Sequence, residues 1–161
     1  MQVAKPGEHF RFMAVSFSQA QAFNQTRQAY LATALAVADT HFTRLRGLIG
    51  LRTDDFRNGS GLWIVPCHGV HTLGMGFAID VVYLDRAMNV IHLQSDLRPW
   101  RFAPVRTEAA SVLELPSHTA AATGTAVGDK IEITINEVAV TVREATSEPA
   151  PLERNGRVPI A

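Results

Sequence analysis

Hydrophobic positions follow two different spacings along this chain, and each spacing predicts a type of secondary structure. Residues 26–40 alternate between apolar and small side chains, which predicts a strand. In the next segment, 41–51, apolar residues recur every three or four positions, and Asp39 or Thr40 can cap its start. We therefore expect a helix over 41–51, directly after the first strand.

Further apolar stretches downstream are short and rich in β-branched and aromatic residues, which predicts strands. They cover residues 62–66, 77–85, 90–94, 110–116 and 130–142, the last as one strand bent near Asn136 or as two strands. The turn-forming stretch RAMN joins the second and third of these into a hairpin. One early helix and about six short strands predict an α+β class, mainly antiparallel β, as a compact strand-rich single domain with one helix near the start.

The chain ends differ in composition from the part between them. We expect residues 1–25 to form an N-terminal extension, frayed or a short edge segment, because Glu8 and a short apolar run fit a secretory signal poorly. The single globular domain is expected over 26–142. Residues 143–161 hold three prolines and no periodicity, which indicates a mobile C-terminal tail.

Composition narrows the classes of function. Of 161 residues, 47% are hydrophobic and 19% charged, which is typical of a globular domain. Fifteen basic residues balance fifteen acidic ones, so we expect no nucleic-acid partner. A single cysteine excludes an internal disulfide, and no apolar run is long enough for a transmembrane segment. We expect a cytoplasmic protein, with a periplasmic or secreted one as the alternative; the oligomeric state stays open.

Four stretches match a known pattern in order and spacing: RLRGLIGL (44–51), CHGVHTLGMGFAIDVVYLD (67–85), VLELP (112–116) and VGDKI (127–131). Together they resemble the DUF192 family, a bacterial and archaeal domain family of unknown function, over roughly residues 28–135. The resemblance implies a compact, strand-rich single domain with one helix near its start, and no established activity.

Two positions depart from the family pattern. Ala78 stands where members commonly have proline, and His118 stands where they have glycine after the ELP turn. We expect the first change to loosen the entry to the 77–85 strand. The second predicts a different turn after Pro116.

Cys67, His68 and His71 could carry chemistry in two ways. They are possible zinc ligands, although on a straight strand Cys67 and His71 would lie about 13 Å apart, too far to share an ion. A bend at Gly69 could shorten that distance. Alternatively Cys67 is a nucleophile with either histidine as its base, which would make the protein an enzyme. The simplest interpretation is a buried cysteine beside two loop histidines.

Asp80 interrupts a strand that is apolar on both faces, so we expect its carboxylate to be at least half buried. A buried carboxylate needs partners, which could be backbone amides, His71, Thr72 or an arginine such as Arg44. Two interpretations stay open: Asp80 fixes a helix or loop through hydrogen bonds, or it lines a pocket.

The 98–106 segment alternates arginines with aromatic residues, which suits either ligand binding or a solvated loop that covers the sheet. We therefore expect a cleft between the 68–80 and 98–106 loops. Its floor and rim would comprise His71, Thr72, Met75, Asp80, Arg98, Trp100 and Arg101. Two other acids are expected to be unremarkable, with Glu114 facing water and Asp129 in a tight turn.

Our first hypothesis is a non-enzymatic binding or accessory domain. It would hold a small polar or anionic molecule, or a partner's peptide segment, in this cleft without a cofactor. One alternative is a Cys/His enzyme, or a zinc or redox site at Cys67, His68 and His71. Another is a protein-interaction module that uses an edge strand or the C-terminal tail.

Overall fold

The computed structural model describes residues 11–144, which fall into two units. One unit is Ser18–Glu137; the other includes residues 11–17 and 138–144. The sites discussed below all belong to the first unit. The expected mobile tail over 143–161 lies almost wholly outside the described residues.

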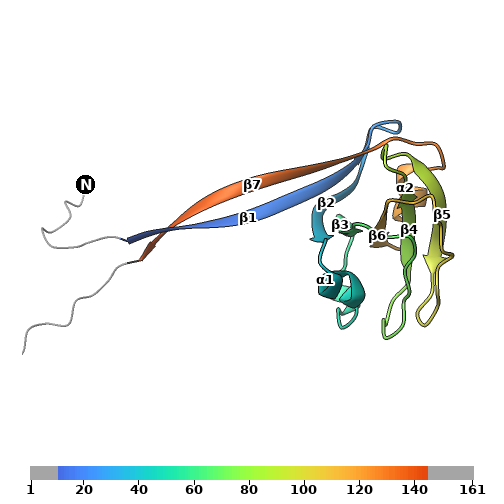
Figure 1. Ribbon diagram of the computed structural model, residues 1–161, viewed down its shortest axis with the longest axis horizontal. Coiled ribbons are helices and arrows are strands. Elements are labelled where there is room, and N and C mark those ends of the chain that lie inside the picture. The colour runs from blue at the N-terminus through green and yellow to red at the C-terminus, as the bar shows by residue number, and fades with distance from the viewer. Residues whose placement is uncertain (1–10, 145–161) are drawn as a thin grey trace, which may run out of the picture. The chain divides into compact units, whose positions relative to one another are not determined.

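The described residues form seven strands in one sheet of order β5-β4-β6-β3-β2-β1-β7 (Figure 1). The strands are β1 (Arg11–Asn24), β2 (Ala29–Ala38), β3 (Ser60–Ile64), β4 (Ile79–Leu84), β5 (Val90–Leu97), β6 (Ser111–Pro116) and β7 (Ile131–Glu144). β2 and β3 run parallel, whereas β6 pairs antiparallel with both β3 and β4, and β4 with β5. The prediction of a strand-rich, mostly antiparallel compact domain is confirmed.

Each apolar stretch expected to be a strand is one, and β4 and β5 form the expected hairpin. The last stretch is the single strand β7, which continues to Glu144. Residues 11–24, expected to be an N-terminal extension, form β1. Pairing with β2 gives the backbone groups of residues 20–24 hydrogen-bond partners, which an unpaired extension would lack.

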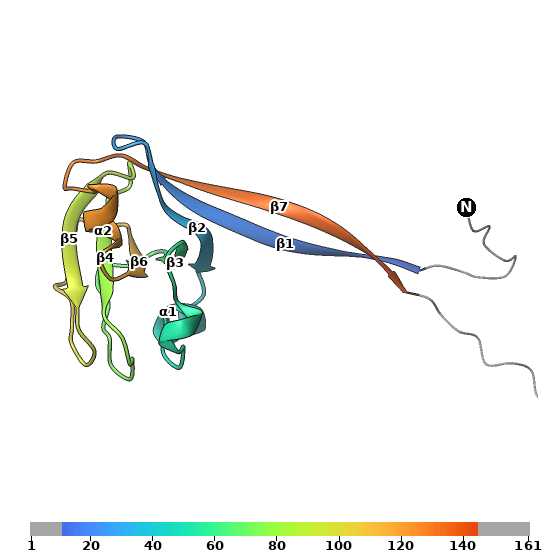
Figure 2. The same ribbon diagram turned by 180° about the vertical axis from the view of Figure 1, so that it is seen from behind.

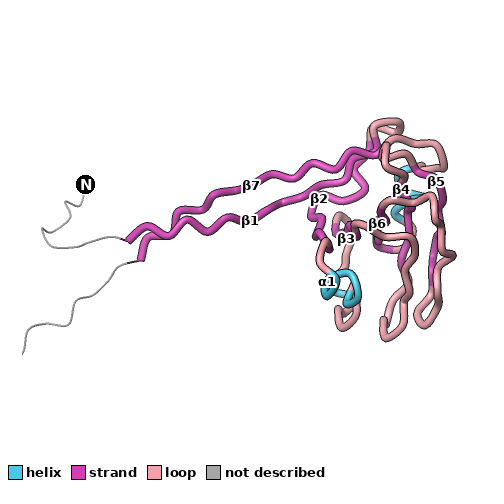
Figure 3. The backbone as a smooth tube through the Cα atoms, in the orientation of Figure 1, coloured by secondary structure: helices cyan, strands magenta, loops and turns pink. Residues whose placement is uncertain are grey.

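The prediction of one helix near the start needs correction. Helical structure after β2 is limited to the six residues of α1 (His41–Arg46), which Thr40 caps by accepting a hydrogen bond from the Thr43 amide (3.2 Å; Figure 3). Gly47 then takes φ 48° and ψ −130°, which ends the helix, and a 3₁₀ turn (η1, Thr53–Asp55) follows. A second helix of five residues, α2 (Thr119–Thr123), was not expected, because one turn is too short to show a helical period.

The sheet separates two apolar clusters, and the alternation along β4 shows both. Ile79, Val81 and Tyr83 pack into a cluster on one face, whereas Val82 and Leu84 pack into a cluster on the other. All six residues of β4 and of β6 are buried, as expected for strands covered on both faces. Helix α2 packs against β2 and β6; Figure 2 shows it next to β6.

Two loops extend past the ends of the strands, one before β4 and one after β5 (Figure 3). They lie side by side, since His71 and Phe102 form an isolated antiparallel bridge. The amide of Thr72 donates to the carbonyl of Arg101 (2.8 Å), and the amide of Trp100 donates to the carbonyl of Thr72 (3.0 Å). The 68–80 and 98–106 loops are therefore neighbours, as the cleft hypothesis requires.

Asp129 lies in a turn, as expected, and its carboxylate also links this turn to the end of β1 and the residues after it. Its carboxylate accepts hydrogen bonds from the Ala126 amide (2.9 Å), from the Asn24 side chain (3.0 Å) and from Arg27 Nε (2.9 Å). The hydrogen bond from Arg27 is the main reason that the pKa of Asp129 falls to about 2. These contacts join the turn before β7 to the turn after β1.

Candidate functional site

Asp80 is fully buried, and its carboxylate binds backbone amides of two other elements. Oδ1 accepts a hydrogen bond from the Asp96 amide (2.9 Å), and Oδ2 accepts one from the Ala120 amide (2.9 Å). Ser117 Oγ in turn donates to the Asp96 carboxylate (2.6 Å). Asp80 therefore fixes the end of β5 and the first turn of α2, which is the structural interpretation of its burial.

Thr72 is also fully buried, and its side chain fastens the two loops together. The hydroxyl donates to the Arg98 carbonyl (2.6 Å) and accepts from the Arg101 amide (3.0 Å). The Arg98 carbonyl and the Arg101 amide lie outside the regular sheet, and the Thr72 hydroxyl gives each of them a hydrogen-bond partner. Thr72 has no hydroxyl hydrogen left over for a ligand.

The remaining residues of the expected cleft do not converge on one hollow. Met75 is buried in the apolar cluster with Ile79, and Asp80 lies on the opposite face of β4 from that cluster. Arg98, Trp100 and Arg101 are exposed at the loop surface. The structure thus brings Thr72 to the three rim residues and His71 to Phe102, but it does not bring Asp80 to either.

The three residues of the zinc and nucleophile alternatives point to different surroundings. Cys67 Sγ donates to the Gly69 carbonyl (3.2 Å), and burial raises the pKa of its thiol. The His68 ring pairs through Nδ1 with the Ala109 carbonyl (2.7 Å). Within residues 11–144, no three His, Cys, Asp or Glu side chains lie close enough together to hold a metal ion.

Glu114 does not face water, contrary to expectation. It lies in β6 between Leu62 of β3 and Val81 of β4, and only 2% of its surface is exposed. Alternation along β6 misled the expectation, because apolar clusters cover both faces of this strand. Burial raises the pKa of the Glu114 carboxyl to about 8, so the side chain is mostly protonated at neutral pH.

Glu114 forms part of the wall of a cavity of about 310 Å³. The other walls come from residues within 41–49, around α1, and from residues within 64–71, between β3 and the first loop. Three of the four stretches that carry the family resemblance contribute to it: 44–51, 67–85 and 112–116. Three of the four stretches that carry the resemblance therefore meet at one cavity.

Two of the residues that line this cavity each have a buried polar atom without a hydrogen-bond partner, Oε2 of Glu114 and Nδ1 of His71. Buried polar atoms are nearly always paired in folded proteins, so these two atoms are unusual. Gly47 lies beside this carboxyl, since a Cβ at its position would be in ordinary contact with Glu114 Oε2 at 3.8 Å.

Arg44 supplies a positive charge to the same wall. Its Nη1 donates to the carbonyls of Asp39 (2.9 Å) and Val65 (3.3 Å), which hold the guanidinium in place. No ion pair joins Arg44 to a carboxylate of the described residues. The cavity thus offers a protonated carboxyl, an imidazole nitrogen and a cation held by neutral carbonyls.

Sequence reasoning named His71 and Cys67 but missed Glu114, Arg44 and Gly47 as parts of one site. The sequence did contain a sign that Glu114 is buried. In VLELP the acid stands between two leucines, and Val112, two residues earlier in the strand, lies on the same face as the acid. That pattern is typical of an acid buried among apolar neighbours when the strand lies inside a sheet.

Fold and cavity define a class of small, strand-rich domains with a buried acid beside a pocket. The chain belongs to the DUF192 family, whose model matches residues 22–133 and is described as "Uncharacterized ACR". No curated protein matches the chain.

Two solved structures share the fold. A protein of unknown function from Novosphingobium aromaticivorans DSM 12444 is 17% identical, with a TM-score of 0.61 over 81% of this chain and 91% of that one. A protein of Sinorhizobium meliloti 1021, described as a candidate transcription regulator, is 17% identical, with a TM-score of 0.60 over 74% of this chain and 94% of that one. At this identity the likeness concerns the fold alone.

No helix among the described residues has the length and hydropathy needed to cross a bilayer.

Proposed function

We propose that this domain binds a small anionic molecule, a carboxylate or a similar oxyanion, in the cavity of Glu114. The observation that carries the proposal is the carboxyl group of Glu114, a residue that lines the cavity and whose Oε2 atom is buried without a hydrogen-bond partner. Leaving such a group unpaired costs about 1–3 kcal/mol, which a ligand that pairs with it would recover.

Charge favours an anion as the ligand. A protonated Glu114 donates a hydrogen bond to an acceptor oxygen, and its pKa of about 8 keeps the proton in place at neutral pH. Arg44 offers a positive charge that is not neutralised by a carboxylate of the described residues. An oxyanion could accept from both groups, whereas an ammonium ligand would meet a cation and a proton donor.

This proposal keeps the expected class of function, a non-enzymatic binding domain without a cofactor, but moves the site. His71 remains part of it, because His71 lines the cavity. The thiol alternative is not favoured, since burial raises the pKa of Cys67 and a nucleophilic thiol needs a lowered one.

Native mass spectrometry of the gently purified full-length chain is the first test, because a retained ligand would appear as an organic adduct. Thermal unfolding with acetate, malonate and inorganic phosphate as probes is the second. We expect at least one probe to raise the midpoint in the wild type and in Glu114→Gln, whose amide still donates a hydrogen bond.

Glu114→Leu should abolish that rise, because leucine has no donor. Glu108→Gln, at an exposed acid outside the cavity, is the matched control and should keep it. If no probe shifts the midpoint and no adduct is found, or if Glu114→Leu binds as the wild type does, the proposal is wrong.

A further inference from the structure

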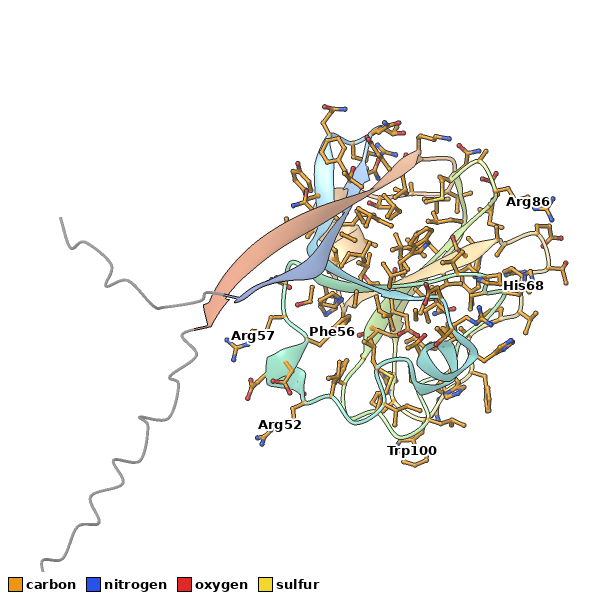
Figure 4. The ribbon with its side chains drawn as sticks, turned by 60° about the vertical axis from the view of Figure 1, so that its left-hand side comes forward. Arg52, Phe56, Arg57, His68, Arg86 and Trp100 are labelled. Carbon is orange, nitrogen blue, oxygen red and sulfur yellow. The ribbon has the colours of Figure 1, made fainter. Side chains whose placement is uncertain are left out.

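Residues 98–106 present three large apolar side chains to solvent. The exposed fractions are 63% for Trp100, 72% for Phe102 and 71% for Val105. Figure 4 shows the Trp100 side chain directed outward from its loop. We call these three residues the apolar tip; large exposed apolar groups gathered in one place are typical of interaction surfaces.

The backbone holds the apolar tip outward rather than letting it fold back. The amides of Ala103 and Arg106 donate to carbonyls of the neighbouring 68–72 segment (2.9 and 2.7 Å). The Tyr83 hydroxyl, which comes from β4, donates to the Pro104 carbonyl (2.7 Å). Because the loop is fastened at several points, the exposure of the tip is built into the fold.

Within the loop itself the charges have one sign, and the acids Asp96 and Glu108 lie just outside it in the sequence. Residues 97–107 include three arginines and no acid. Arg98 and Arg101 are exposed, and neither forms an ion pair with a carboxylate among the described residues. Arg106 is half-buried, and its guanidinium contacts the ring of His92, so we do not count it among the exposed charges of the loop.

We propose that the 98–106 loop docks the domain onto an anionic lipid bilayer. Trp100, Phe102 and Val105 would enter the interface between headgroups and acyl chains, where an aromatic ring with a polar edge is favoured. Arg98 and Arg101 would pair with headgroup phosphates. This proposal is independent of the Glu114 cavity.

A bilayer fits these residues better than single-stranded nucleic acid does. Strand binding requires a long basic groove with several stacking platforms. Here the loop has two exposed arginines, Arg98 before the tip and Arg101 within it, and the chain has no net charge. The phenylalanine and valine gain most from an apolar phase, because they have no polar edge to pair with a base.

Vesicle binding tests the proposal with the full-length chain. Vesicles of phosphatidylcholine with about 30% phosphatidylserine should co-sediment the protein, and pure phosphatidylcholine should retain less of it. The chain has two tryptophans, so Trp63→Phe leaves Trp100 as the reporter. Its fluorescence should shift to the blue on the anionic vesicles and be quenched by lipids brominated on the acyl chain.

Matched variants separate the tip from the rest of the surface. Trp100→Ala with Phe102→Ser should weaken binding about tenfold or more, and each of Arg98→Gln and Arg101→Gln about fivefold. Val127→Ser and Arg86→Gln change exposed residues away from the tip and should leave binding unchanged; Figure 4 shows Arg86 far from Trp100. Circular dichroism checks that every variant is folded.

Absence of vesicle binding at low ionic strength would overturn the proposal. Binding that survives loss of the tip, with the variants folded, would overturn it as well. Retention by single-stranded oligonucleotides but not by vesicles would replace the bilayer with nucleic acid.

Discussion

The carboxylate of Asp80 and the backbone amide of Ala120 are joined by a 2.9 Å hydrogen bond between residues that lie 40 positions apart. α2 is only one turn long, so its own hydrogen bonds are too few to keep it helical in water. The buried carboxylate of Asp80 in β4 accepts a hydrogen bond from one of its free amides, and the N-terminal end of a helix favours a negative charge.

We expect Asp80→Asn to lower the free energy of unfolding by about 2–3 kcal/mol. An amide retains one acceptor oxygen, so one of the two backbone amides loses its partner while buried. Urea denaturation measures the change. Asp54→Asn alters an exposed carboxylate and is the control; equal stabilities for the two variants would contradict the structural role.

The raised pKa of Glu114 predicts a pH dependence of stability. The folded carboxyl holds its proton to about pH 8, and the unfolded one loses it near 4.5. Its contribution is therefore complete below pH 4.5 and is lost as pH rises through 8, on the order of 5 kcal/mol in all. Glu114→Gln should remove this dependence.

The comparison is made by urea unfolding of the wild type and Glu114→Gln at about pH 5 and about pH 9. The wild type should lose stability relative to the variant at the higher pH. A constant difference between the two proteins would show that Glu114 titrates alike in the folded and unfolded chain.

Thr72→Val should loosen the 98–106 loop. Valine keeps the shape of threonine but removes a hydroxyl that serves the Arg98 carbonyl and the Arg101 amide. We expect a loss of about 1–3 kcal/mol and faster hydrogen exchange at the Arg101 amide. Thr107→Val, at an exposed position, is the control, and unchanged exchange at Arg101 would argue against the hydroxyl bridge.

Cys67 should react slowly with thiol reagents in the folded protein. Burial raises the pKa of the thiol, so less thiolate is present at neutral pH. With Ellman's reagent we expect a rate several-fold below that of the chain unfolded in urea. A native rate equal to the unfolded one would reopen the nucleophile alternative.

Local pattern was enough to predict most of the fold. β-branched and aromatic content gave β4 and β5 as a hairpin, and the alternation over 26–40 gave β2, because these signals lie within one strand length. The helix prediction was wrong in extent, since Gly47 ends α1 after six residues. The sequence did not predict α2, because its first turn is fixed by a hydrogen bond to Asp80, a residue distant in sequence.

The candidate site was likewise predictable from the sequence only in part. The pattern of residues placed His71 in a loop and Asp80 in a buried strand. The family resemblance identified three stretches that line the cavity. Only the tertiary structure decided that Asp80 turns to α2 and that Glu114 lies beside the cavity. The physical reason is that burial depends on which strands flank β6 and what covers each face, and sheet order is set by contacts between distant segments.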